Sequence, residues 1–171
     1  EAAAEVKPAA ETLKYVVNNG GEFTLTKDIE VNESLEATTA NDIVINGNGK
    51  TIKVMKKGTG RFIDVKSDAN GANLTLKNLT IENNVSWIER IVNYNTNGNL
   101  TLENVKIVNA EGCSNNYAIN LPAYSDNAKV VIKDSEIWAG ANALNLWGEK
   151  TTANITNSKL YVVDSNATEG Y

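Results

Sequence analysis

Short segments in which apolar and polar residues alternate recur along the chain. Four of them align without a gap: 74–81 (LTLKNLTI), 100–107 (LTLENVKI), 130–137 (VVIKDSEI) and 153–160 (ANITNSKL). Two earlier segments, 23–31 and 43–52, fit the pattern more loosely. Alternation of this kind is typical of β-strands, and recurrence every 23 to 31 residues is typical of a solenoid. The pattern therefore predicts an all-β solenoid of about six short coils.

Three apolar columns run through the aligned segments, and we expect them to face the core. The first is Phe23, Ile43, Leu74, Leu100, Val130 and Ala153; the second is Leu25, Ile45, Leu76, Leu102, Ile132 and Ile155; the third is Val31, Ile52, Ile81, Ile107, Ile137 and Leu160. A further short strand follows in most units, with apolar pairs at Ile63 and Val65, Val92 and Tyr94, Ile119 and Leu121, and Leu144 and Leu146. Each coil thus contains about three short strands.

The polar positions support the same alignment. One outward column reads Thr26, Asn46, Lys77, Glu103, Lys133 and Thr156, and another reads Glu30, Thr51, Thr80, Lys106, Glu136 and Lys159. Lysine and glutamate alternate within both columns, so stacked coils would place unlike charges side by side. The bend after the first strand carries Asp28, Gly47, Asn78, Asn104, Asp134 and Asn157. These residue types tolerate left-handed backbone angles, and stacked amides hydrogen-bond to one another, so we expect a structural ladder there.

The start of the chain has the signals of a helix that caps the stack. Residues 9–18 (AAETLKYVVN) place apolar side chains on one helical face, Pro8 precedes them and Gly20 follows. We expect residues 1–7 to be a linker and residues 8–171 to form one domain, with a capping helix at 8–19 and coils over 22–171. The C-terminal residues 162–171 show no comparable cap.

The run ETLKYVVNNGGEFTLTKDIEV (11–31), followed by INGNGKTI (45–52), resembles a known family. It is similar to the N-terminal cap and first coils of secreted bacterial right-handed parallel β-helix proteins of the pectin-lyase-like fold, especially surface and adhesin-like members from gut bacteria. The resemblance covers most of the chain. It implies a single-stranded right-handed parallel β-helix and a secreted or cell-surface location. It implies no particular function, because the fold hosts lyases, hydrolases, esterases, tailspikes and adhesins.

Composition excludes several classes of function. The chain has 16 basic and 21 acidic residues, a net charge of −5, which disfavours nucleic acid as a partner. No apolar run is long enough to insert into a membrane. There is no histidine, which removes histidine-based catalysis and metal sites, and the single Cys113 excludes an internal disulfide. We expect no catalytic residue, no metal ligand and no cofactor, and the oligomeric state stays open.

The candidate ligand-binding residues are of three kinds. They are the amides Asn93, Asn120 and Asn145, which form an outward row with Asp64; the aromatic residues Trp138, Trp147 and Tyr124; and the arginines Arg61 and Arg90. Aromatic faces and amides bind sugars, and an arginine pair would hold uronate or sulfate groups. The structural alternative is that the rings pack loops against the stack and the arginines pair with nearby acidic residues.

These observations favour a non-catalytic secreted or cell-surface module, adhesin-like or in contact with an extracellular glycan. The alternative is a calcium-assisted polysaccharide lyase, or a degenerate relative, that acts on uronic-acid polymers. Calcium would be required only in that case. A third reading is a structural spacer within a larger surface protein.

Overall fold

The computed structural model describes residues 8–55 and 60–163. The predicted linker and the last eight residues lie outside the described part. One helix, α1 (Ala9–Asn19), precedes fourteen strands in the described residues. The strands are β1 (Gly21–Thr24), β2 (Ile29–Val31), β3 (Leu35–Ala37), β4 (Ile43–Val54), β5 (Arg61–Val65), β6 (Leu74–Asn83), β7 (Ile88–Tyr94), β8 (Asn99–Asn109), β9 (Asn115–Leu121), β10 (Lys129–Lys133), β11 (Glu136–Ala139), β12 (Asn142–Leu146), β13 (Thr152–Thr156) and β14 (Lys159–Val162).

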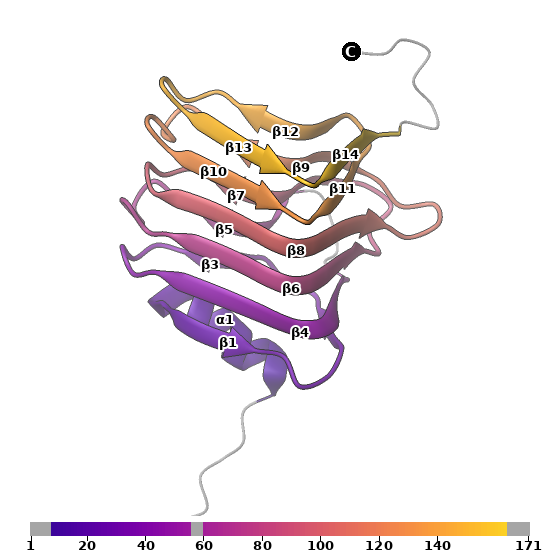
Figure 1. Ribbon diagram of the computed structural model, residues 1–171. Helices are drawn as coiled ribbons and strands as arrows, with labels where there is room; N and C mark the ends of the chain where they lie inside the picture. The colour runs from indigo at the N-terminus through magenta and orange to yellow at the C-terminus, as the bar shows by residue number, and fades with distance from the viewer. Residues whose placement is uncertain (1–7, 56–59, 164–171) are drawn as a thin grey trace, which may run out of the picture.

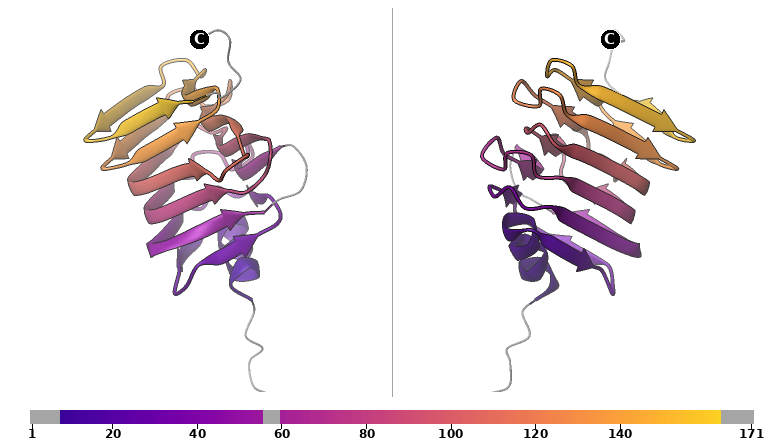
Figure 2. Two further views of the ribbon diagram at one scale, coloured as in Figure 1. Left: turned by 90° about the vertical axis from the view of Figure 1, so that its right-hand side faces the viewer. Right: turned by 60° about the vertical axis from the view of Figure 1, so that its left-hand side comes forward.

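The strands form two parallel sheets that wind into a β-solenoid of about five turns (Figure 1). The larger sheet has the order β1-β4-β6-β8-β10-β13, and β2, β11 and β14 join it beyond a bend. The smaller sheet has the order β12-β9-β7-β5-β3. Figure 2 shows the coils stacked one above another, with α1 at one end. The predicted parallel solenoid with an N-terminal helix is confirmed.

The core consists of the predicted apolar columns. From the second coil onward the register matches the sequence alignment, with Leu74 beside Leu100 and Leu100 beside Val130. The side chains of Leu74, Leu100 and Ile107 are completely buried. A coil alone cannot cover such a face, so each one is stabilised by the coils on either side.

The first coil differs from the predicted alignment by two residues. Phe23 lies beside Ile45, where we expected Ile43, and Val31 lies beside Val54, where we expected Ile52. A slip of two residues keeps every side chain on its own face of the strand, so the alternation of apolar and polar residues is satisfied by both registers. The apolar pattern alone could not exclude the wrong register.

The bend between the two arms of the large sheet is built on left-handed residues. Asn78, Asn104, Asp134 and Asn157 have φ angles of 51°, 53°, 50° and 45°. Asn104 Nδ2 donates to Asn78 Oδ1 at 3.0 Å, and Asn157 donates in the same way to Asp134. The expected structural ladder is thus present. In β4 the left-handed residues are Asn48 and Gly49, with φ angles of 50° and 76°, rather than the predicted Gly47. A Cβ on Gly47 would lie 2.4 Å from the Asn78 carbonyl oxygen.

The two ends of the described stack differ in burial. Leu13 and Val17 of α1 are completely buried against the first coil, so the helix caps that end. At the other end the apolar column is open: Ile132 is 0% exposed, whereas Ile155, the next residue in the same column, is 42% exposed.

This difference predicts unequal costs for the same substitution. Ile132→Ala should lower the free energy of unfolding by about 2–5 kcal/mol, because it leaves a cavity in a closed core. Ile155→Ala is the matched control and should cost below about 1 kcal/mol, since its side chain already meets solvent. Urea unfolding followed by circular dichroism measures both. Equal losses would mean that the last described coil is covered in solution.

Candidate functional site

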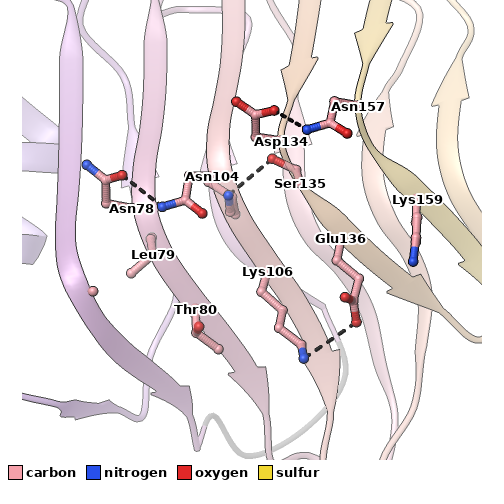
Figure 3. A pocket seen from close by; sticks show the side chains of 12 residues that line it. Asn78, Leu79, Thr80, Asn104, Lys106, Asp134, Ser135, Glu136, Asn157 and Lys159 are labelled. Carbon is pink, nitrogen blue, oxygen red and sulfur yellow. Dashed lines mark hydrogen bonds and ion pairs between the residues drawn. The ribbon is translucent and has the colours of Figure 1, made fainter.

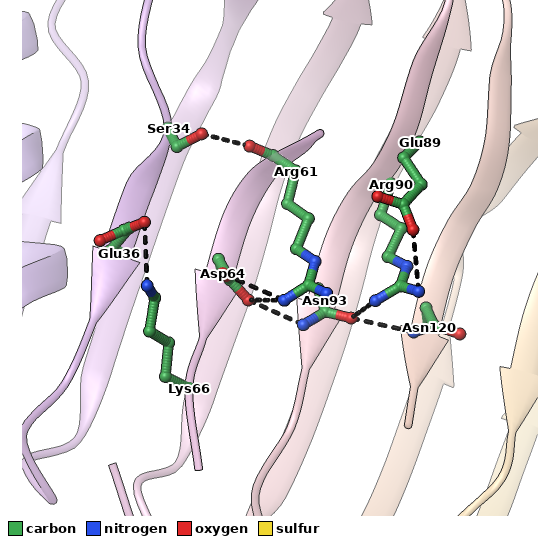
Figure 4. A network of polar contacts seen from close by, with 9 residues as sticks. All are labelled: Ser34, Glu36, Arg61, Asp64, Lys66, Glu89, Arg90, Asn93 and Asn120. Atoms are coloured by element: carbon green, nitrogen blue, oxygen red, sulfur yellow. Dashed lines mark hydrogen bonds and ion pairs between the residues drawn. The ribbon is translucent and has the colours of Figure 1, made fainter. Parts of the chain in front are cut away.

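The outer face of the small sheet carries the predicted arginines and amides (Figure 4). In β5, the neighbouring residues Phe62 and Ile63 are both completely buried, so the alternation of inward and outward residues is interrupted once. Arg61 and Asp64 therefore lie on the same side of the strand, and Arg61 Nη1 is 3.4 Å from Asp64 Oδ2.

The next strand repeats this arrangement around Arg90. Arg90 Nη1 donates to Asn93 Oδ1 at 3.0 Å, and Arg90 Nη2 lies 2.9 Å from Glu89 Oε1. The guanidinium also lies over the ring of Tyr117, 5.7 Å from its centre. Its Nε is buried and has no hydrogen-bond partner among the described residues. Arg90 is thus held from three directions, and its buried Nε keeps an unused N–H.

A row of side chains, which we name the Asp64 ladder, crosses four strands of this sheet. It consists of Asp64, Asn93, Asn120 and Asn145. Each amide donates to the side chain before it: Asn93 to Asp64 at 2.7 Å, Asn120 to Asn93 at 2.9 Å and Asn145 to Asn120 at 2.7 Å. The row is therefore one chain of hydrogen bonds that all donate in the same direction, toward the Asp64 carboxylate.

The ladder is less accessible than the sequence indicates. Asp64, Asn93 and Asn120 are 5%, 0% and 2% exposed, so three side chains of the predicted outward row are buried. The physical reason is the stacking itself, since side chains on adjacent parallel strands are close enough to bond to one another and cover each other. Only Asn145, at the end of the row, is half-buried.

A pocket of about 240 Å³ lies at that end of the ladder. Its lining consists of Arg90, Tyr117, Asn120, Pro122, Ala123, Asn145 and Trp147. Four of the eight predicted ligand-binding residues, Arg90, Asn120, Asn145 and Trp147, are thus brought together. The indole of Trp147 is 72% exposed and forms one side of the pocket. The mixture of an exposed indole, two amides and a guanidinium suits a small polar ring with an apolar face.

The other predicted residues lie elsewhere. Arg61 and Asn93 belong to the polar network beside the pocket but do not line it. Tyr124 is 71% exposed, and its backbone N–H donates to Asn95 Oδ1 at 3.3 Å. Trp138 stacks on Tyr161, with ring centres 4.1 Å apart, and lines a separate pocket of about 460 Å³ with Cys113. Trp138 and Trp147 are therefore parts of two different surfaces.

A hollow of about 500 Å³ follows the bend of the large sheet (Figure 3). Its walls are the ladder of Asn78 and Asn104 and the charged pair of Lys106 and Glu136, 3.5 Å apart. Trp138 Nε1 donates to Glu136, and this hydrogen bond and Lys106 hold the pKa of Glu136 below its usual value. The polar groups here are largely paired with one another, as expected for a structural ladder.

Three residues of the pocket were not predicted from the sequence: Tyr117, Pro122 and Ala123. Tyr117 is in register with Arg90 on the neighbouring strand, and that register could have been read from the alignment of the second strands. Pro122 and Ala123 follow β9, and their place beside Trp147 depends on the course of a loop that no repeat pattern describes.

The described residues contain no group of three or more acidic or cysteine side chains placed to hold a metal ion. Within 8–55 and 60–163, no helix has the length and apolarity to cross a bilayer. Searches with protein-family models, curated proteins and solved structures find no match to this chain.

The Asp64 ladder makes a prediction about stability. Asn93→Ala removes a bond to Asp64, one from Arg90 and one from Asn120, and should cost about 1–3 kcal/mol because buried polar groups lose their partners. Asn145→Ala removes one bond at a half-buried end and should cost less. Urea unfolding of both variants measures the two losses in the free energy of unfolding and checks that the loss for Asn93→Ala is the larger. A larger loss for Asn145→Ala would contradict the burial described above.

Cys113 gives a prediction about pH. Burial raises the pKa of its thiol, and Glu82 raises it further, so the fraction of thiolate at neutral pH is below that of an ordinary cysteine. Iodoacetamide should therefore alkylate native Cys113 more slowly than the same residue in urea, and the midpoint of its pH–rate profile should lie higher in the native protein. A lower native midpoint would refute this.

Proposed function

We propose that the chain is a non-catalytic secreted or cell-surface module of a bacterium that contacts an extracellular glycan through the pocket beside Trp147. The observation that carries the proposal is the assembly of an exposed indole, two ladder amides and a fixed arginine around one cavity of about 240 Å³. An indole covers the apolar face of a sugar ring, and amides orient its hydroxyl groups. The adhesin-like reading and the pectin-lyase-like family remain part of this proposal.

A lyase is less well supported. Such an enzyme needs acidic ligands for calcium and a base near the substrate, and the described residues provide no such acidic group. Each arginine is already engaged with a carboxylate, Arg61 with Asp64 and Arg90 with Glu89. A structural spacer, in contrast, would explain the stack but gives no reason for an exposed indole beside the end of the Asp64 ladder.

Trp147→Ala tests the proposal. We expect the wild-type chain to be retarded by a glycan in affinity gel electrophoresis, and the variant to lose at least about tenfold in affinity, since hot-spot aromatic residues contribute about 2 kcal/mol or more. Trp87→Ala is the matched control, because Trp87 is exposed at 45% and lines none of the pockets described above.

Three results would contradict the proposal. Equal losses in the two variants would place the binding surface outside the pocket. Loss on Trp138→Ala with retention in Trp147→Ala would assign the glycan to the pocket beside Cys113. Release of an unsaturated product from a uronic-acid polymer, followed by its ultraviolet absorbance, would show the alternative lyase activity.

A further inference from the structure

The charge of the one cation in the pocket lining is already compensated within the protein. Arg90 is the only ionised residue among the described lining residues, and its Nη2 lies 2.9 Å from Glu89 Oε1. Glu89 does not line the pocket, so its carboxylate compensates the charge of the guanidinium without being part of the pocket wall. Nη1 is occupied by Asn93 at 3.0 Å. Both terminal nitrogens thus already hold an acceptor within the protein, and the charge of the guanidinium is compensated, although Nε keeps an unused N–H.

The direction of the Asp64 ladder points to the same selectivity. Every amide nitrogen in the row donates toward Asp64, so every amide oxygen points toward the pocket end. The last oxygen, Asn145 Oδ1, accepts no hydrogen bond from a described residue. An amide oxygen at the end of such a chain is polarised by the bonds behind it and attracts a donor. A sugar hydroxyl is a donor, whereas a carboxylate or sulfate brings only acceptors.

The net charge of the whole chain also disfavours anionic ligands. With 21 acidic and 16 basic residues, the chain repels a polyanion before any contact is made. We infer that the pocket selects neutral sugar residues and rejects uronate and sulfate groups, with Glu89 as the residue that sets this preference. The inference rests on the proposed function, because it names the class of glycan that the same pocket takes.

A glycan array that carries neutral, uronate-containing and sulfated oligosaccharides tests the inference on the full chain. The expected result is binding to neutral glycans alone, lost in Trp147→Ala. Binding of a uronate or sulfated glycan that Trp147→Ala abolishes would overturn the inference and leave the proposed function standing. An array with no bound glycan would remove the proposed function, and the inference with it.

Glu89→Gln tests whether Glu89 sets the preference for neutral sugars. The substitution keeps the size of the side chain and removes its charge, so the Arg90 guanidinium becomes available to an anion. The ratio of uronate binding to neutral binding should rise about tenfold, as expected for one uncompensated charge near a ligand. The gained uronate binding should weaken in about 0.5 M salt, because salt screens ionic contacts.

Glu103→Gln is the matched control. Glu103 also pairs with a cation, Lys133 at 3.7 Å, but it belongs to the large sheet and lines none of the pockets described above. In Glu103→Gln the ratio of uronate binding to neutral binding should not change. A Glu89→Gln variant with the wild-type ratio, or a rise of equal size in Glu103→Gln, would overturn the role of Glu89.

Discussion

The whole structure depends on parallel, in-register stacking of one coil on the next. In this arrangement each residue lies beside the residue in the same position of the neighbouring coil, about 4.8 Å away. Like side chains therefore meet like side chains unless the sequence alternates. The apolar columns satisfy this constraint by burial, the asparagine columns by mutual hydrogen bonds, and the lysine and glutamate columns by alternating charge, as in the pair of Lys133 and Glu103.

Stacking also explains why the bends and the site share one chemistry. Asparagine is at once tolerant of the left-handed backbone at the bend and able to donate and accept along the stack. At the bend, Asn78 and Asn104 use both properties. On the small sheet, Asn93 and Asn120 use only the second, and Asp64 terminates their row. The abundance of asparagine, 26 residues in the chain, thus follows from repeated stacking rather than from one binding site.

The repeat made most of the fold predictable, and its failures have physical causes. The apolar columns from Ile43 onward and the helix that ends at Asn19 follow from periodicity and from the glycine after it. The register of Phe23 could not be predicted from the apolar pattern, because a two-residue slip preserves the face of every side chain. The burial of Asn93 could not be predicted from hydropathy either. Hydropathy assigns an amide to the surface and takes no account of hydrogen bonds between neighbouring amides.

The candidate site was partly predictable for the same reason. Asn120 and Asn145 hold equivalent positions in successive coils, so a correct register brings them together. Arg90 stands three residues before Asn93, the equivalent of Asn120, and reaches the row because the alternation of the strand is interrupted, whereas Trp147 and Pro122 depend on loops. A stacked row consumes the hydrogen-bonding capacity of its interior members and leaves it free at its end. Recognition on such a solenoid is therefore favoured where a ladder stops, and among the described residues Asn145 is where the Asp64 ladder stops. In the proposed glycan site, the length of the row beneath that residue would contribute to binding through its polarity, although no ligand would reach its buried members.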